Sequence, residues 1–143
     1  MELELPATPP SVRAARSAVS RAPAVLALDP QWRDDVVLIV SELVSNAVAA
    51  APAGTSVAVR VEEAPGCLTV EVRNVVDDAP HFPERPSMPP PPQPNGRGLA
   101  LVHRMSTAVF TSVDHHVLTV TAVLQLDDAR RVVTNTSDHD VNA

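Results

Sequence analysis

The stretch SELVSNA, residues 41–47, lies inside an apolar, helix-like run and combines a carboxylate, Glu42, with a carboxamide, Asn46. A four-residue separation places both side chains on one face of a helix, one turn apart. Burying such groups among apolar neighbours without polar partners is unfavourable. The two side chains therefore either meet solvent at the edge of the helix or face something polar, and the rest of the chain must distinguish these cases.

The run around this stretch predicts a helix over residues 30–51. Asp29-Pro30 is a start signal, because aspartate caps the first turn and proline suits the first helical position. Pro52 and Gly54 end the helix. Its apolar stripe consists of Val36, Val40, Leu43 and Ala47, widened by Val37, Val44 and Val48.

After this helix the apolar period changes to two, which predicts an antiparallel hairpin. In SVAVRVE, residues 56–62, the three valines share one face, and in CLTVEVRN, residues 67–74, Asn74 shares a face with three aliphatic residues. The turn between the strands contains Pro65-Gly66 in the expected order. Asn74 is therefore expected on the buried face.

The remaining elements follow from the same signals. Residues 2–5 alternate as a short strand, and Thr8-Pro9-Pro10 begins an amphipathic helix that reaches about Ala22. Strands are expected at 108–113 and 117–126, with His115-His116 as the turn between them. The alternative is that the two histidines bind a metal ion, although no third ligand lies nearby in the sequence. We expect one domain over residues 1–126 and a polar, poorly ordered tail over 127–143.

The segment 75–95 differs in kind, because eight of the fifteen prolines lie between Pro80 and Pro94. We expect an extended, lid-like loop, with a polyproline ligand for a partner as the alternative. It leads into Gly96-Arg97-Gly98 at a predicted loop-to-helix junction, followed by a short amphipathic helix. Such a junction either brings backbone N–H groups close to a phosphate or is simply a hinge that starts the helix.

Composition excludes several classes of function. The net charge of −6 argues against a nucleic-acid binder, which needs a basic face. All eleven basic residues are arginine, so chemistry that needs a lysine is excluded. The single cysteine, Cys67, allows neither an internal disulfide nor a metal–thiolate cluster. The acidic, proline-bearing start and the lack of a long apolar run predict a cytoplasmic protein that does not enter a membrane.

Glu42 and Asn46 have three interpretations at this point. Their oxygens are ligands of the kind that Mg²⁺ accepts together with water and phosphates. Glu42 also suits a general base. The third interpretation is a solvated polar stripe at the helix edge. The conjunction of four features favours a nucleotide-binding site. These features are the helix with the acid and the amide, the hairpin, the long loop and the glycine turn, which occur in this order and together could enclose a nucleotide.

Two of these motifs together resemble a known family. VSELVSNAV, residues 40–48, resembles the N-box, and NGRGLALV, residues 95–102, resembles the second glycine box, of the histidine-kinase-like (GHKL) ATPase superfamily. The order of elements and the opening TPPSVRAARSAV, residues 8–19, are similar to the small anti-sigma-factor serine kinases of high-GC bacteria. The resemblance implies an α+β two-layer sandwich, in which a mixed, mostly antiparallel sheet is covered on one face by about three helices.

The resemblance also implies roles for particular residues. Glu42 matches the general base, and Asn46 matches the asparagine that binds the Mg²⁺ bridging the ATP phosphates. Gly96, Arg97 and Gly98 match the phosphate-contacting turn, with Leu99 opening the helix below it.

At the adenine-binding position the family generally has an aspartate followed by a small residue, whereas this chain has Asn74 and Val76. Asparagine still offers a carbonyl acceptor but not a charged one. A register shift that substitutes Asp77 or Asp78 is the alternative. His115-His116 stands where relatives often have a glycine-containing pair.

The function implied is a Mg-ATP-binding regulator of the anti-sigma type that phosphorylates a serine on an antagonist protein. Its partners would be a sigma factor or that antagonist, and the resemblance allows a homodimer through residues 2–5. The alternative is a non-catalytic protein-binding module of the same fold with weak or no ATP binding, which Asn74, Val76 and the proline-rich loop favour.

Overall fold

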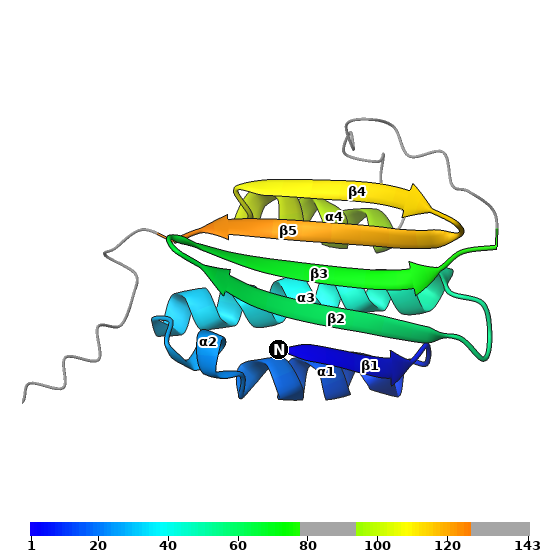
Figure 1. The fold of residues 1–143 in the computed structure, drawn as a ribbon, viewed down its shortest axis with the longest axis horizontal. Coiled ribbons are helices and arrows are strands. Elements are labelled where there is room, and N and C mark those ends of the chain that lie inside the picture. The colour runs from blue at the N-terminus through cyan, green and yellow to red at the C-terminus, as the bar shows by residue number, and fades with distance from the viewer. Residues whose placement is uncertain (78–93, 127–143) are drawn as a thin grey trace, which may run out of the picture.

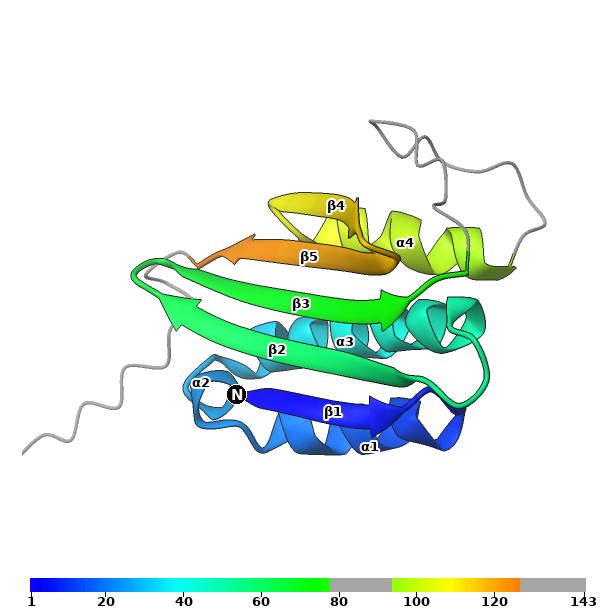
Figure 2. The same cartoon turned by 45° about the vertical axis from the view of Figure 1, so that its right-hand side comes forward.

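The computed structural model describes residues 1–77 and 94–126, and for residues 94–97 it describes the backbone alone. The elements in chain order are β1 (Glu2–Pro6), α1 (Pro10–Ser20), α2 (Pro23–Leu26), α3 (Pro30–Ala50), β2 (Ser56–Ala64), β3 (Cys67–Val75), α4 (Pro94–Met105), β4 (Ala108–Asp114) and β5 (Val117–Gln125). The strands form one sheet in the order β1-β2-β3-β5-β4, and every described ladder is antiparallel. The helices form a second layer on one face of this sheet (Figures 1 and 2). The predicted two-layer α+β class is confirmed.

The long helix α3 begins where the sequence predicts. The Asp29 carboxylate accepts a hydrogen bond of 3.0 Å from the backbone N–H of Trp32, and Pro30 is the first helical residue. This cap satisfies one of the N–H groups that the first turn leaves without a helical partner. The short helix α2 was not predicted from the sequence, which indicated only one helix reaching about Ala22. Pro23 follows that helix and begins a new turn.

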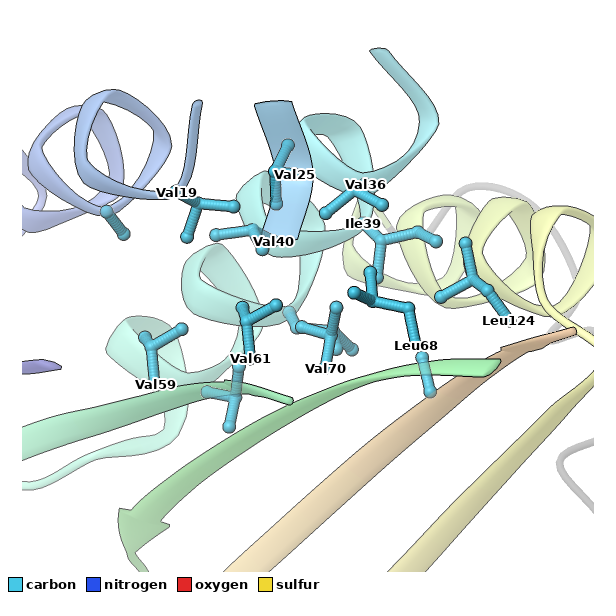
Figure 3. Close-up of a cluster of buried hydrophobic side chains, with 14 of the residues drawn as sticks. Val19, Val25, Val36, Ile39, Val40, Val59, Val61, Leu68, Val70 and Leu124 are labelled. Atoms are coloured by element: carbon cyan, nitrogen blue, oxygen red, sulfur yellow. The ribbon is translucent and has the colours of Figure 1, made fainter. Parts of the chain in front are cut away.

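The core lies between α3 and the helix-facing side of the sheet. Ile39 and Val40 of α3 belong to one buried cluster with Val61, Leu68 and Val70 of β2 and β3 (Figure 3). Each of these side chains is almost completely buried, and full burial of a Val, Leu or Ile contributes about 1.5–3 kcal/mol. This packing fixes the orientation of α3, and with it the side on which Glu42 and Asn46 emerge.

The predicted hairpin is confirmed in position and in face. Cys67 pairs with Ala64 across a tight turn in which Gly66 has φ +75°, a conformation that glycine adopts without strain. Val57 and Leu118 flank Asn74 in the sheet, and Asn74 is 4% exposed. A polar side chain therefore lies on the helix-facing side of β3, close to the C-terminal end of the strand.

The second hairpin turns at His115 and His116, as predicted, and both residues have positive φ, +46° and +62°. A two-residue hairpin with φ > 0 at both positions normally has Asn-Gly or a similar pair, because other side chains are strained there. The backbone N–H of Val76 donates a 2.8 Å hydrogen bond to the His116 carbonyl. This bond joins the end of β3 to the turn between β4 and β5.

One boundary differs from the prediction. The sequence places Gly96 and Gly98 at a loop-to-helix junction with Leu99 opening the helix, whereas α4 begins at Pro94 and contains both glycines. Proline suits a first helical position, and glycine weakens a helix by about 1 kcal/mol relative to alanine without forbidding it. Packing against the rest of the fold therefore outweighs the local preference.

The predictions for the proline-rich loop and for the tail lie mostly or wholly outside the described residues, so the division into a domain over 1–126 and a tail stays a prediction. In the described part of the chain, no helix is both long and apolar enough to cross a membrane.

Candidate functional site

The helix α3 presents Glu42 and Asn46 beside its buried stripe. Both residues are half-buried, while Leu43 and Ala47, which follow each of them in the sequence, are 3% and 4% exposed. Because the buried stripe is held against β2 and β3, the two polar side chains emerge along its flank rather than on the outer surface. The sequence-based expectation that they share one helix face follows from this regular α-helix.

The Glu42 side chain reaches α4 at Gly98. A Cβ atom added to Gly98 would overlap Glu42 Oε2 and lie 3.1 Å from Glu42 Cδ. Gly98 is buried and its φ is not positive, so a larger residue here would be limited by the space that Glu42 occupies rather than by backbone conformation. The N-box-like helix and the glycine-box-like helix, which are far apart in the sequence, therefore meet at these two residues.

The helices α3 and α4 pack side by side and run in opposite directions (Figures 1 and 2). Because Glu42 lies against Gly98, the next turn of α3, which bears Asn46, points towards the N-terminal end of α4. A helix N-terminus presents unpaired backbone N–H groups and the positive end of the helix dipole. This end of the helix pair thus combines a carboxylate, an amide and N–H donors.

The two polar side chains have unused hydrogen-bonding capacity. Within residues 1–77 and 98–126, neither the Glu42 carboxylate nor the Asn46 amide has a hydrogen-bond or ion-pair partner. The same part of the chain contains no cluster of three or more His, Cys, Asp or Glu residues that could hold a metal ion. A cation here would therefore take most of its ligands from water and phosphate oxygens, which is the usual arrangement for Mg²⁺.

Asn74 and Val76 form a second part of the candidate site. The Asn74 Nδ2 group donates a 3.0 Å hydrogen bond to the Val75 carbonyl, which leaves the Oδ1 carbonyl as the acceptor that the side chain can offer. Val76 is 6% exposed and is held by its bond to His116, whereas Asp77 is exposed. Asp77 therefore does not take the buried place of Asn74. Asp78, the other residue considered for this shift, lies outside the described residues.

The other predicted site residues are placed as follows. Gly96 and Arg97 belong to the first turns of α4, and the side chain of Arg97 lies outside the description. Leu99 is partly buried and packs against the core, so it supports the helix from below. Sequence reasoning missed two contacts, that of Gly98 with Glu42 and that of His116 with Val76, because neither has a local sequence signal.

Residues 5–124 match the family model described as histidine kinase-like ATPase domain. The chain belongs to this family. The family resemblance inferred from residues 40–48 and 95–102 is thereby confirmed. Comparison with curated proteins found no match.

The fold of this histidine kinase-like ATPase domain is also similar to a solved structure, that of the RsbU and RsbW domains of Rv1364c from Mycobacterium tuberculosis. The TM-score is 0.62 at 20% sequence identity, and the match covers 94% of this chain and 35% of that chain. This chain thus spans about a third of the length of the solved one. At this level of identity the similarity establishes the fold.

Proposed function

We propose that this ATPase-family domain binds Mg-ATP between α3 and α4 and acts as a regulator of the anti-sigma type. The principal support is the contact of the Glu42 carboxylate with Gly98, which brings together the two motifs that the family resemblance assigns to ATP. The similarity of the fold to a structure that includes an RsbW domain supports the regulatory part of the proposal.

The residues present fit a magnesium-bound nucleotide. Asn46 offers a carbonyl oxygen to the metal and has no partner within residues 1–77 and 98–126. The backbone of Gly96, Arg97 and Gly98, close to the N-terminus of α4, would face the phosphates, with Leu99 anchoring the helix. When bound, Mg²⁺ neutralises phosphate charge and orients the transferred group.

Asn74 would receive the adenine amino group. Its Nδ2 group is committed to the Val75 carbonyl, so Oδ1 is oriented as the acceptor. A neutral acceptor makes a weaker hydrogen bond than the aspartate that is usual in the family, by about a factor of two. We therefore expect adenine recognition with reduced affinity.

In the kinase form of the proposal, the acceptor is a serine hydroxyl on an antagonist protein. Glu42 would accept the proton of that hydroxyl as the oxygen bonds to the γ-phosphorus, while the bond from the γ-phosphorus to the bridging oxygen breaks and ADP leaves. The Glu42 carboxylate is half-buried, free of cation partners within residues 1–77 and 98–126, and adjacent to the glycine helix, as such a base requires. The protein partners proposed are a sigma factor and this antagonist.

Titration calorimetry with ATP, with and without Mg²⁺, tests nucleotide binding. We expect the parent chain to bind ATP in the presence of Mg²⁺. The Asn46→Ala variant should lose most of the gain in ATP affinity that Mg²⁺ gives the parent. Gln31→Ala is the matched control, because Gln31 is an exposed carboxamide on the same helix, and it should bind like the parent. No heat at millimolar nucleotide, or equal binding by Asn46→Ala and the parent, would reject the proposal.

A second candidate function is a protein-binding module that has lost nucleotide binding. The buried Val76 side chain favours it, because a bulky residue stands where the family has a small one beside adenine. If this second function is correct, Glu42→Ala and Asn46→Ala leave the affinity for the protein partner unchanged, both with and without ATP. A partner affinity that depends on ATP in the parent and not in these variants would contradict it.

A further inference from the structure

Aliphatic side chains surround Asn74 in the sheet. Val57 of β2 and Leu118 of β5 are its partners across the neighbouring strands. Val72 and Val76 lie two positions before and after it along the chain. These four residues are at most 7% exposed, and Asn74 itself is 4% exposed. In such surroundings a polar atom that meets the wrong kind of partner is costly, because little water can compensate for the lost hydrogen bond.

The side-chain amide of Asn74 has a fixed orientation. Its Nδ2 group lies 3.0 Å from the Val75 carbonyl oxygen, a place that an N–H donor occupies favourably and a second carbonyl oxygen does not. Among the described residues Oδ1 has no partner, and it does not belong to the unpartnered side-chain atoms that are completely buried there. The atom that Asn74 offers to a ligand is therefore a hydrogen-bond acceptor.

This acceptor lies at the same end of the molecule as the proposed phosphate site. The strand β3 ends on the side where α3 ends and α4 begins (Figures 1 and 2). The helix α3 packs against both β3 and α4, so the three elements are held together. A nucleotide whose phosphates meet Asn46 and the start of α4 would direct its base towards the end of β3.

On the basis of the proposed nucleotide binding, we propose that the site selects nucleotides whose base bears an exocyclic amino group, whether the base is a purine or a pyrimidine. Adenine and cytosine present an amino donor, at N6 and N4, whereas other bases have a carbonyl oxygen at the corresponding position. The amino group of ATP or CTP donates a hydrogen bond to Asn74 Oδ1. A carbonyl oxygen in its place brings two acceptors together at a buried position, which is unfavourable.

The close packing around Asn74 explains why the size of the base is not read. Only 4% of the residue is exposed, and Val57, Val76 and Leu118 pack around it, so the described residues leave no slot in which a ring lies along the amide. The base therefore meets Oδ1 at its edge, through the amino group. Adenine and cytosine share this amino edge and differ in ring size, so they should bind with similar affinity.

Two matched pairs of nucleotides test this selection. Inosine triphosphate (ITP) differs from ATP, and UTP from CTP, by a carbonyl oxygen in place of the amino group. In titration calorimetry with Mg²⁺, ATP and CTP should have affinities within about threefold of each other. Each should bind about tenfold more tightly than its carbonyl counterpart, because the counterpart leaves the buried acceptor without a donor.

A variant of Asn74 tests whether this side chain is responsible. Asn74→Leu removes the acceptor and fills a similar space among aliphatic neighbours, so the fold should be retained, which circular dichroism checks. ATP and CTP should then bind about tenfold more weakly, at the level of ITP and UTP. Thr69→Val is the control, because it is a polar-to-apolar change on the opposite face of the same strand, and it should keep the selection of the parent.

The results distinguish this selection from the proposed function. If ATP binding depends on Asn46 but ITP binds equally well, or CTP binds more than about tenfold more weakly than ATP, the amino selection is wrong and the proposed function stands. A preference for ATP over ITP that persists in Asn74→Leu also overturns the selection by this residue. If none of the four nucleotides binds, the proposed function and the selection are both rejected.

Discussion

Gly98→Ala adds one methyl group at the point where α4 approaches the Glu42 carboxylate. In the structure this methyl would overlap Glu42 Oε2 and lie 3.1 Å from Cδ and 3.7 Å from Cβ. The backbone conformation at Gly98 accepts alanine, because φ is not positive. The atom in conflict is the flexible end of a side chain, so we expect Glu42 to rotate while the fold is retained.

The free energy of unfolding should show two opposing effects. Alanine stabilises a helix by about 1 kcal/mol relative to glycine, and forcing Glu42 out of its preferred rotamer costs roughly 0.5–1.5 kcal/mol. In the parent the two nearly cancel, so Gly98→Ala should change stability by less than about 0.5 kcal/mol. In a Glu42→Ala background the conflict is absent, and the same substitution should stabilise by about 1 kcal/mol.

Urea denaturation of the four proteins in this double-mutant cycle gives the coupling between Glu42 and Gly98. The control cycle replaces Glu42→Ala by Asp34→Ala, because Asp34 is an exposed acid on the same helix, and it should show no coupling. If Gly98→Ala stabilised the chain equally with and without the Glu42 side chain, the contact on which the candidate site rests would be refuted. Because the readout is stability alone, the result does not depend on the proposed nucleotide.

Three further predictions concern the scaffold. Asp29→Ala should destabilise the fold by about 1 kcal/mol in urea, because the Trp32 N–H at the start of α3 loses its acceptor. Ile39→Ala should lower the free energy of unfolding by about 2–5 kcal/mol, since Ile39 is fully buried. Leu38→Ala, at an exposed position of the same helix, should lower it far less, and similar losses for the two variants would contradict the packing described. The double substitution His115→Asn with His116→Gly should raise the free energy of unfolding by roughly 1–2 kcal/mol, because both positions have positive φ. Thermal unfolding measures this, and a lower melting temperature would contradict the turn geometry.

Several features of this protein were predictable because their causes are local. Asp29-Pro30 fixes the start of α3 through the capping bond, and the alternation in residues 67–74 places Asn74 inside the sheet without reference to any distant residue. The family could be recognised for a related reason, because the characteristic residues of each motif lie within eight or nine consecutive positions, 40–48 and 95–102.

Other features depend on contacts between segments that are far apart in the sequence. The glycines at 96 and 98 have the local preferences of a turn, yet they lie in α4, because that helix packs against α3 and the core. The approach of Glu42 to Gly98 and the bond from Val76 to His116 arise only when helices and strands are assembled.

By itself the sequence determined the five strands, the positions of α1 and α3, which faces are apolar, and which motifs identify the family, but neither α2 nor the start of α4. Only the tertiary structure decided that Glu42 of α3 packs against Gly98 of α4, where the absence of a side chain leaves room for the carboxylate. It also decided that β1 and β4 form the two edges of the described sheet. The physical reason is that hydrophobic period and capping act over one or two turns of chain, whereas packing and strand order are settled by the whole core.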